Sequence, residues 1–239
     1  MTTFIILNYI KMKHGKKYVE AAWLLERWKA YSIQEAVKLV KQTSVVKFDA
    51  TVEMAVKTNA NPKYNDQVIR ATTILPHGTG KSKKVAVFVS EDRLEEAKKS
   101  GADVFGAWDL LDAIKAGKTD FDILLTTPDC IRELAPIAKI LWPKGLMPSP
   151  KAGTVTNDLS KTVEEFKKWK IGFKLDKTWN IHVPVWKVSF DDAKLVENIS
   201  ALLAALEENK PTWVKGKLVK KVVIASSMWP GIIIEYTGK

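Results

Sequence analysis

The chain has 239 residues, 46% hydrophobic and 27% charged, which is enough to bury a core in one large or two modest domains. Its 38 Lys and Arg against 27 Asp and Glu give a net charge of +11, which favours a polyanionic partner, nucleic acid before an anionic membrane. A single cysteine excludes an intramolecular disulfide, and no stretch reaches the roughly 18 apolar residues of a membrane span.

The first part of the chain predicts a helix followed by half-buried strands. Ser32 and Glu35 have the spacing of a capping box, and the apolar residues behind them predict an amphipathic helix. Alternating apolar and polar residues over 48–56 predict a strand with one face toward water, and 68–75 predicts a second strand. Residues 1–11 are interpreted as an upstream extension, with the protein itself starting at residue 12.

The pattern changes in the middle of the chain. Residues 84–89 and 121–126 are continuous apolar runs, which are typical of buried parallel strands. A further helix is expected after Thr127, with Pro128 at its first position. The other expected elements are a helix at 92–100, a short strand at 103–105 and a helix at 107–116. This order predicts a small three-layer unit with a parallel sheet.

Alternation returns after the Pro- and Gly-rich loop 143–153. The expected elements are a helix at 158–168, strands at 171–175 and 181–190, a helix at 192–209 capped by Asp191, and strands at 217–227 and 231–236. The first segment has too little to bury its strand faces alone, so we expect it to pair with the last. The predicted fold class is therefore α/β with two domains: a split two-layer α/β domain, 12–77 plus 169–239, with an inserted three-layer Rossmann-like α/β domain, 78–168.

Motifs for catalysis or cofactors are incomplete. The stretch 78–82, GTGKS, has Leu75 where a phosphate-binding loop needs its first Gly, and it precedes a strand instead of a helix. Cys130 is interpreted as a buried structural cysteine, and the three histidines lack the spacing of metal ligands. We therefore expect no metal and no cofactor.

Basic clusters are the remaining signal. They are Lys11, Lys13, Lys16 and Lys17; Lys81, Lys83 and Lys84; Lys167, Lys168 and Lys170; and Lys215, Lys217, Lys220 and Lys221. Each cluster alone is typical of a solvated face, but together they suit contacts to phosphates.

Six motifs of the chain are distinctive: KFDATVE (47–53), DQVIRATTILPHGTGK (66–81), TPD (127–129), PKGLMPSPKAGTV (143–155), DKTWNIH (176–182) and SSMWPG (226–231). These motifs resemble the ribosomal protein L-one family. They run in order from about residue 12 to the end. The resemblance implies two α/β domains, the second inserted into the first, and a constituent of the large ribosomal subunit that is not an enzyme.

The resemblance also implies partners. Members bind large-subunit rRNA at the mobile stalk, beside the exit site for deacylated tRNA, and aid release of that tRNA. Bacterial members also bind their own mRNA and repress its translation. The expected location is the cytoplasm, on the ribosome, with a monomer outside it and no membrane contact. An enzyme with a nucleotide or phosphate site in the inserted domain, and a free mRNA-binding regulator, are the competing hypotheses; the second stays open as a further role.

Carried onto this sequence, the resemblance implies an RNA-binding face and a hinge. The expected RNA-binding residues are Lys16, Lys47, Phe48, Thr51, Glu53, Lys177, His182, Ser226, Ser227 and Met228. The expected hinge residues are Gly78 and Trp169, one at each crossing between the domains.

The tryptophans depart from the family pattern. The chain has 9 Trp and only 12 Gly. The family has Gly where this chain has Trp142, Trp169, Trp179, Trp186 and Trp229. Two of them, Trp142 and Trp179, lie in loops where a positive φ is expected, which is costly for a residue with a Cβ. Our hypothesis is that UGA codons translated here as Trp are read as Gly by the source organism; the alternative is true divergence.

Overall fold

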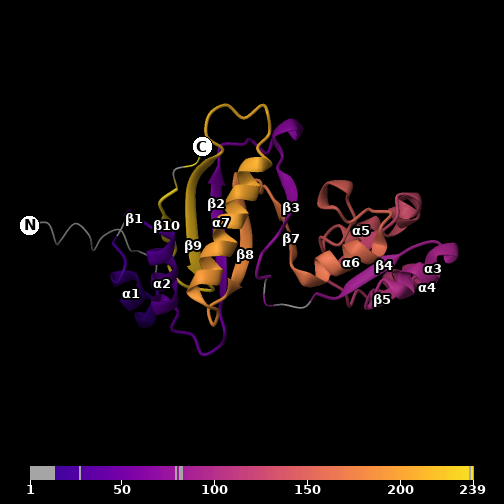
Figure 1. The fold of residues 1–239 in the computed structure, drawn as a ribbon, viewed down its shortest axis with the longest axis horizontal. Helices are drawn as coiled ribbons and strands as arrows, with labels where there is room; N and C mark the ends of the chain where they lie inside the picture. Colours follow the sequence, from indigo (N-terminus) through magenta and orange to yellow (C-terminus); the bar gives the residue numbers. More distant parts are fainter. Residues whose placement is uncertain (1–13, 27, 79, 81–82, 237, 239) are drawn as a thin grey trace, which may run out of the picture.

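The computed structural model describes residues 14–26, 28–78, 80, 83–236 and 238. The expected extension at 1–11 lies outside these residues, as do Lys11, Lys13 and Lys81. The described strands form three sheets, with the orders β1-β10-β9-β2-β8, β3-β7 and β5-β4-β6 (Figure 1). The expectation of a mixed α/β fold is confirmed.

The largest sheet joins the two ends of the chain. Its strands are β1 (Ala30–Tyr31), β2 (Thr51–Thr58), β8 (Asn180–Lys187), β9 (Val219–Ser226) and β10 (Ile232–Ile234). Strand β2 lies between β9 and β8 and is antiparallel to both. The predicted pairing of the first segment with the last is confirmed, because the apolar faces of these strands can be buried only together.

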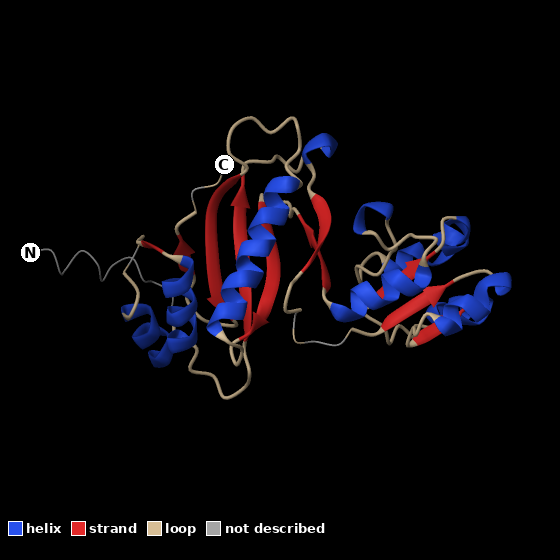
Figure 2. Cartoon of the chain, viewed as in Figure 1, coloured by secondary structure: helices blue, strands red, loops and turns tan. Residues whose placement is uncertain are grey.

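Helices cover one face of this sheet. They are α2 (Ile33–Thr43) and α7 (Asp192–Glu208), and α7 crosses the strands in Figure 2. Met54 of β2, Val183 of β8 and Ile224 of β9 point into the same core as the helices. Burying one such side chain stabilises the fold by about 1.5–3 kcal/mol. The opposite face of β2 carries Thr51, Glu53, Ala55 and Lys57, which are half-buried or exposed.

The ends of these helices test two capping predictions. The Ser32 hydroxyl accepts a hydrogen bond from the N–H of Glu35 at 3.3 Å, and the Glu35 carboxylate accepts one from the N–H of Ser32, so the capping box is confirmed. Asp191 is the N-cap residue of α7, as predicted, but its side chain makes no capping hydrogen bond. A further helix, α1 (Lys16–Trp23), was not predicted.

The middle of the chain forms a parallel sheet. Its strands are β4 (Val85–Phe88), β5 (Val104–Gly106) and β6 (Ile123–Thr126), and both neighbours of β4 run parallel to it. The helices around it are α3 (Leu94–Lys99), α4 (Trp108–Lys115), α5 (Ala138–Leu141) and α6 (Leu159–Lys168). Separate apolar clusters lie on its two faces, one with α4 and α5 and one with α3 and α6. Strands β4 and β6 lie between these two clusters and are continuous apolar runs, as predicted, whereas the edge strand β5 is more exposed.

One predicted helix of this region has another form. Asp129–Ile137 is a 3-10 helix that starts after Pro128, with no side-chain cap. Pro136 lies inside it and has no N–H for the α-helical ladder, which accounts for the difference. Cys130 lies within the core there and is buried, as predicted. Short 3-10 turns also occupy Asn65–Gln67, Glu91–Arg93 and Pro150–Ala152.

A two-stranded ribbon connects these parts. Strands β3 (Arg70–Ile74) and β7 (Lys170–Lys174) pair antiparallel along their whole length. Figure 1 shows this ribbon between the large sheet and the parallel sheet. No helix among the described residues is long and apolar enough to cross a membrane.

Candidate RNA interface

Two predicted motifs meet at one end of the large sheet. The N–H of Ser227 donates to the carbonyl of Thr51 at 3.0 Å, and the N–H of Thr51 donates to the hydroxyl of Ser227 at 3.3 Å. These residues are 176 apart in the sequence. Strand β2 begins at Thr51 where β9 ends, so antiparallel pairing brings the loop before β2 against the turn after β9.

The side chains around this junction are open to solvent. Phe48 is 55% exposed and Met228 is 82% exposed, although both are large and apolar. Lys47 is exposed beside Phe48, and Lys187 of β8 donates to the hydroxyl of Thr51 at 3.1 Å and to the carbonyl of Asp49 at 3.0 Å. Exposed apolar groups among cations and hydroxyls offer stacking, phosphate and 2′-hydroxyl contacts.

The uncovered face of the sheet continues from this junction. Glu53 lies on it, two residues along β2 from Thr51. The next outward position, Ala55, is paired with His182 of β8, and Lys57 is paired with Lys221 of β9. We call the uncovered face, with Lys47, Phe48, Ser227 and Met228 at its end, the open face. It holds the predicted residues Thr51, Glu53 and His182.

Ser226 differs from its expectation. As the last residue of β9 it is 3% exposed, and its hydroxyl has no hydrogen-bond partner within the described residues. Alternation along the strand places it on the core side, opposite to its neighbours Ala225 and Ser227. The predicted contact of its side chain with RNA is therefore corrected: the hydroxyls outside the core at this junction are those of Thr51, which accepts from Lys187, and Ser227, which is bonded to the Thr51 backbone.

Lys177 and His182 lie toward the other end of the sheet. Thr51 of β2 pairs with Lys187 of β8, and Lys57 of β2 pairs with Asn180 of β8. The turn with Lys177 is therefore roughly 20 Å from the junction. Asp176 organises this turn: burial raises the pKa of its carboxyl, but hydrogen bonds from Thr178 and Asn180, with His182 nearby, hold that pKa below its usual value. The predicted residues therefore line a length of sheet, not one spot.

The predicted residue Lys16 is the first residue of α1, a helix that reaches the junction through Tyr18. Tyr18 stacks on Trp229 with ring centroids 6.4 Å apart, and His14 stacks on Tyr18 at 4.2 Å. Trp229 directly follows Met228. Sequence reasoning missed this contact because α1 is short, buries only Ala21, and stacks on a turn that lies far along the chain.

The two predicted hinge residues touch each other. A Cβ on Gly78, which has φ +74°, would lie 1.9 Å from Cδ1 of Trp169, so the indole rests directly on the Gly78 backbone. Asn198 of α7 is fully buried and holds this crossing: it accepts from the N–H of His77 and donates to the carbonyl of Gly78, each at 3.2 Å. Thr79, Lys81 and Ser82, which follow, lie outside the described residues.

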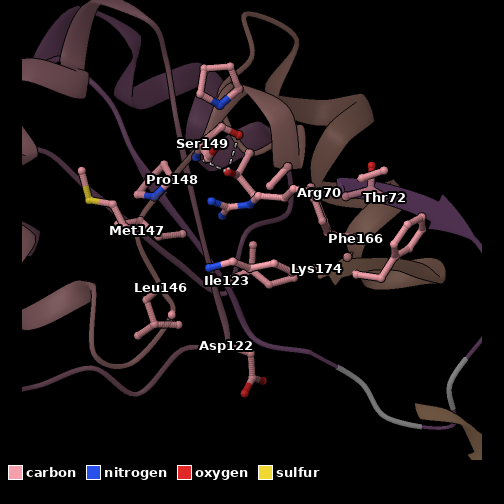
Figure 3. A pocket seen from close by; sticks show the side chains of 18 of the residues that line it. Arg70, Thr72, Asp122, Ile123, Leu146, Met147, Pro148, Ser149, Phe166 and Lys174 are labelled. Atoms are coloured by element: carbon pink, nitrogen blue, oxygen red, sulfur yellow. Dashed lines mark hydrogen bonds between the residues drawn. The ribbon is translucent and has the colours of Figure 1, made fainter. Parts of the chain in front are cut away.

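A second cationic surface contains Lys83, which belongs to a predicted basic cluster, together with Arg70 and Lys174, which the sequence did not predict. Arg70 and Lys174 pair directly across the ribbon and line a cleft of about 880 Å³ between β3, β7 and the loop around Met147 (Figure 3). Lys83 lies at the same cleft, where burial lowers the pKa of its amine. Like charges opposite each other repel. Their pairing depends on strand register, which the sequence alone does not give.

The open face combines an uncovered sheet with an exposed Phe and Met, hydroxyls and lysines. This combination is typical of a nucleic-acid-binding protein. Within the described residues no group of His, Cys, Asp and Glu has the arrangement of a metal site.

The family model of the Ribosomal protein L1p/L10e family matches residues 40–230 of the chain. The chain belongs to this family. It is a ribosomal protein of the large subunit that binds rRNA, and it is not an enzyme.

Proposed function

We propose that the open face is the rRNA-binding surface and that its target is the mobile stalk of the large subunit. The observation that carries this is the junction, where hydrogen bonds between Thr51 and Ser227 join the two segments that carry the exposed side chains of Phe48 and Met228. Exposure of a Phe side chain to water is unfavourable. An exposed Phe beside lysines therefore suits a base or ribose that covers it.

The finer role follows from this position. A stalk protein beside the tRNA exit site would contact deacylated tRNA and aid its release. The same face would bind a similar structure in the protein's own mRNA and repress translation, as bacterial members of the family do. Both partners are polyanions, and the net charge of +11 favours both. The location that goes with this role is the ribosome in the cytoplasm, with a monomer outside it.

We also propose that the chain divides into 12–77 plus 169–239 and an inserted 78–168, hinged at Gly78 and Trp169. Three features support this division. The apolar cluster of the large sheet contains residues from both ends of the chain. The clusters of the parallel sheet contain residues from the middle alone. The crossings at Gly78 and Trp169 lie against each other.

Phe48→Ala tests the proposed face, with Phe105→Ala as its matched control. Phe105 is 42% exposed on β5, away from the open face. We expect Phe48→Ala to weaken binding of a stalk rRNA fragment about tenfold, the loss of one stacked contact of about 1–3 kcal/mol. Phe105→Ala should leave the affinity unchanged. Equal losses in both variants, with intact circular dichroism, would contradict the assignment.

Co-sedimentation separates the ribosomal role from a free regulator of mRNA. A structural constituent remains with large subunits at moderate salt, and a free regulator is released into the supernatant. We expect the protein in the large-subunit fraction, and recovery in the supernatant alone would contradict a stalk location.

A further inference from the structure

Two tryptophans have a backbone conformation that suits glycine. Trp28 has φ +68° and Trp179 has φ +70°. Met228 is the third residue of this kind among the described residues other than glycine. In the left-handed region the Cβ crowds the following carbonyl, so L-residues rarely adopt it, and bulky residues least of all.

A third tryptophan carries an unpaired polar atom. The indole Nε1 of Trp229 is buried and has no hydrogen-bond acceptor within the described part of the chain. Buried N–H groups are normally paired, and a buried Trp usually finds a partner for its Nε1. Glycine has no such atom, so this position too fits glycine better than tryptophan.

The exposure of the tryptophans is also atypical. Trp28 is 82% exposed, and seven of the nine tryptophans belong to the exposed large hydrophobic residues. They are Trp23, Trp28, Trp108, Trp142, Trp169, Trp179 and Trp213. Tryptophan is highly buried on average in folded proteins. An RNA-binding face does not account for this distribution, because Trp108 lies on α4 beside the parallel sheet.

The positions do not all support glycine equally. Trp142 has φ −62°, so the expected positive φ is wrong there and confirmed only at Trp179. Trp186 is buried and packs on Phe190 with ring centroids 3.9 Å apart, which suits an aromatic side chain. Trp23 and Trp108 lie in helices, where glycine is unfavourable.

We propose that the protein made in its own organism carries glycine at positions 28, 179 and 229. Trp28 and Trp179 have left-handed backbones, and Trp229 has an unpaired indole N–H. These unfavourable features lie in separate loops, and glycine removes all three. A single cause accounts for them, namely a UGA codon read as Gly in the organism and as Trp in this sequence. Independent divergence would require a separate compensation at each position.

The replacement at 229 changes the surface that RNA meets. This consequence rests on the proposed function. Trp229 follows the exposed Met228 and covers one face of the Tyr18 ring. With glycine there, the indole no longer covers the backbone of the turn after β9 or packs on Tyr18, which keeps its stacking with His14. Close approach of an RNA backbone to a protein backbone is a common use of glycine.

Peptide mass spectrometry of the protein isolated with large subunits from the source organism tests the proposal directly. We expect peptides with Gly at positions 28, 179 and 229. Tryptophan at any of the three would overturn it. The result does not depend on which surface binds RNA, so a failure of the proposed function leaves this outcome unaffected.

A second measurement uses the recombinant chain without RNA. Trp28→Gly and Trp179→Gly should each raise Tm by about 2–4 °C, because each removes a strained backbone conformation. Tyr64→Gly is the control, since Tyr64 is an exposed aromatic residue in a turn without a positive φ. It should not raise Tm. A fall in Tm in either Trp variant would show that the indole is a native part of the fold and would overturn the proposal.

Discussion

Single residues at the junction combine strain with exposure. Met228 has φ +71° and is 82% exposed, so the fold neither relaxes its backbone nor buries its side chain. Strained residues persist where the surrounding structure fixes them, and they cluster at functional sites. The hydrogen bonds between Ser227 and Thr51 fix this turn. The Met228 side chain is therefore held out from the sheet, where RNA can cover it.

Met228→Gly separates stability from binding. Glycine relieves the left-handed backbone, so we expect the free energy of unfolding to rise by about 0.5–1 kcal/mol. The lost side chain should weaken rRNA binding about tenfold, or about 1.4 kcal/mol. Met228→Ala should lose the same affinity without gaining stability. Urea unfolding and RNA titration measure the two quantities; a Gly variant that binds as well as the parent would remove Met228 from the interface.

Local sequence patterns predicted most of the helices and strands, but they predicted fewer of the contacts at the candidate site. Alternation predicted β2 and β8, and continuous apolar runs predicted β4 and β6, because burial on one face or two leaves those patterns. The short α1 was missed, since its contacts are mainly aromatic stacking on a distant turn. Ser226 was assigned to the RNA face because sequence gives the motif but not which side of β9 each residue faces.

Strand register and long-range strand pairing set the positions of the site residues that the sequence did not predict. Lys177 and His182 are in one motif, yet the turn places Lys177 beyond the end of β2 while His182 lies on the open face. Arg70 and Lys174 are far apart in the sequence, and only the pairing of β3 with β7 makes them neighbours. Such sites depend on which strands pair, whereas the elements depend on nearby residues.

Asp103 links strand β4 of the parallel sheet to helix α6, and this link can be tested by pH. Its carboxylate accepts from the N–H of Val85 and from Lys167, each at 2.9 Å, and these bonds hold the pKa of Asp103 below its usual value. A folded-state pKa below the unfolded value contributes stability that is present above the unfolded pKa, about 3.9. It is lost as the pH falls through the folded value.

Asp103→Asn should therefore lower the denaturant midpoint at pH 7 and lose less stability than the parent between about pH 5 and pH 2. Asp120→Asn is the control, because Asp120 is exposed and has no hydrogen bond or ion pair in the described structure. Urea unfolding at pH 7 and across the acid range measures the stability of each variant and of the parent. Equal acid sensitivity in Asp103→Asn and the parent would show that Asp103 does not link the two elements.

At the scale of the whole molecule, the proposed hinge lies at the two crossings between the large sheet and the parallel sheet. The Trp169 indole rests on Gly78, and buried Asn198 holds the same crossing. Hinge motion requires a few terminal residues to change φ and ψ freely. An indole packed on one crossing opposes such a change, and glycine at 169 would allow it.

Trp169→Gly should consequently broaden the range of arrangements in solution. We expect small-angle scattering of the parent to fit one arrangement and that of the variant to require several. Trp108→Gly removes an exposed indole from α4, away from the crossings, and should scatter like the parent. Identical profiles for Trp169→Gly and the parent would show that the indole does not restrain the hinge.

Ultraviolet cross-linking of the full chain to large-subunit rRNA, followed by peptide mapping, tests the open face most directly. Phe48 and Met228 are exposed at the junction, where the Thr51–Ser227 bonds bring residues 47–53 and 226–228 together. The predicted result is cross-linked peptides from both segments on the same rRNA region. Cross-links confined to residues 78–168 would contradict the open face as the rRNA-binding surface.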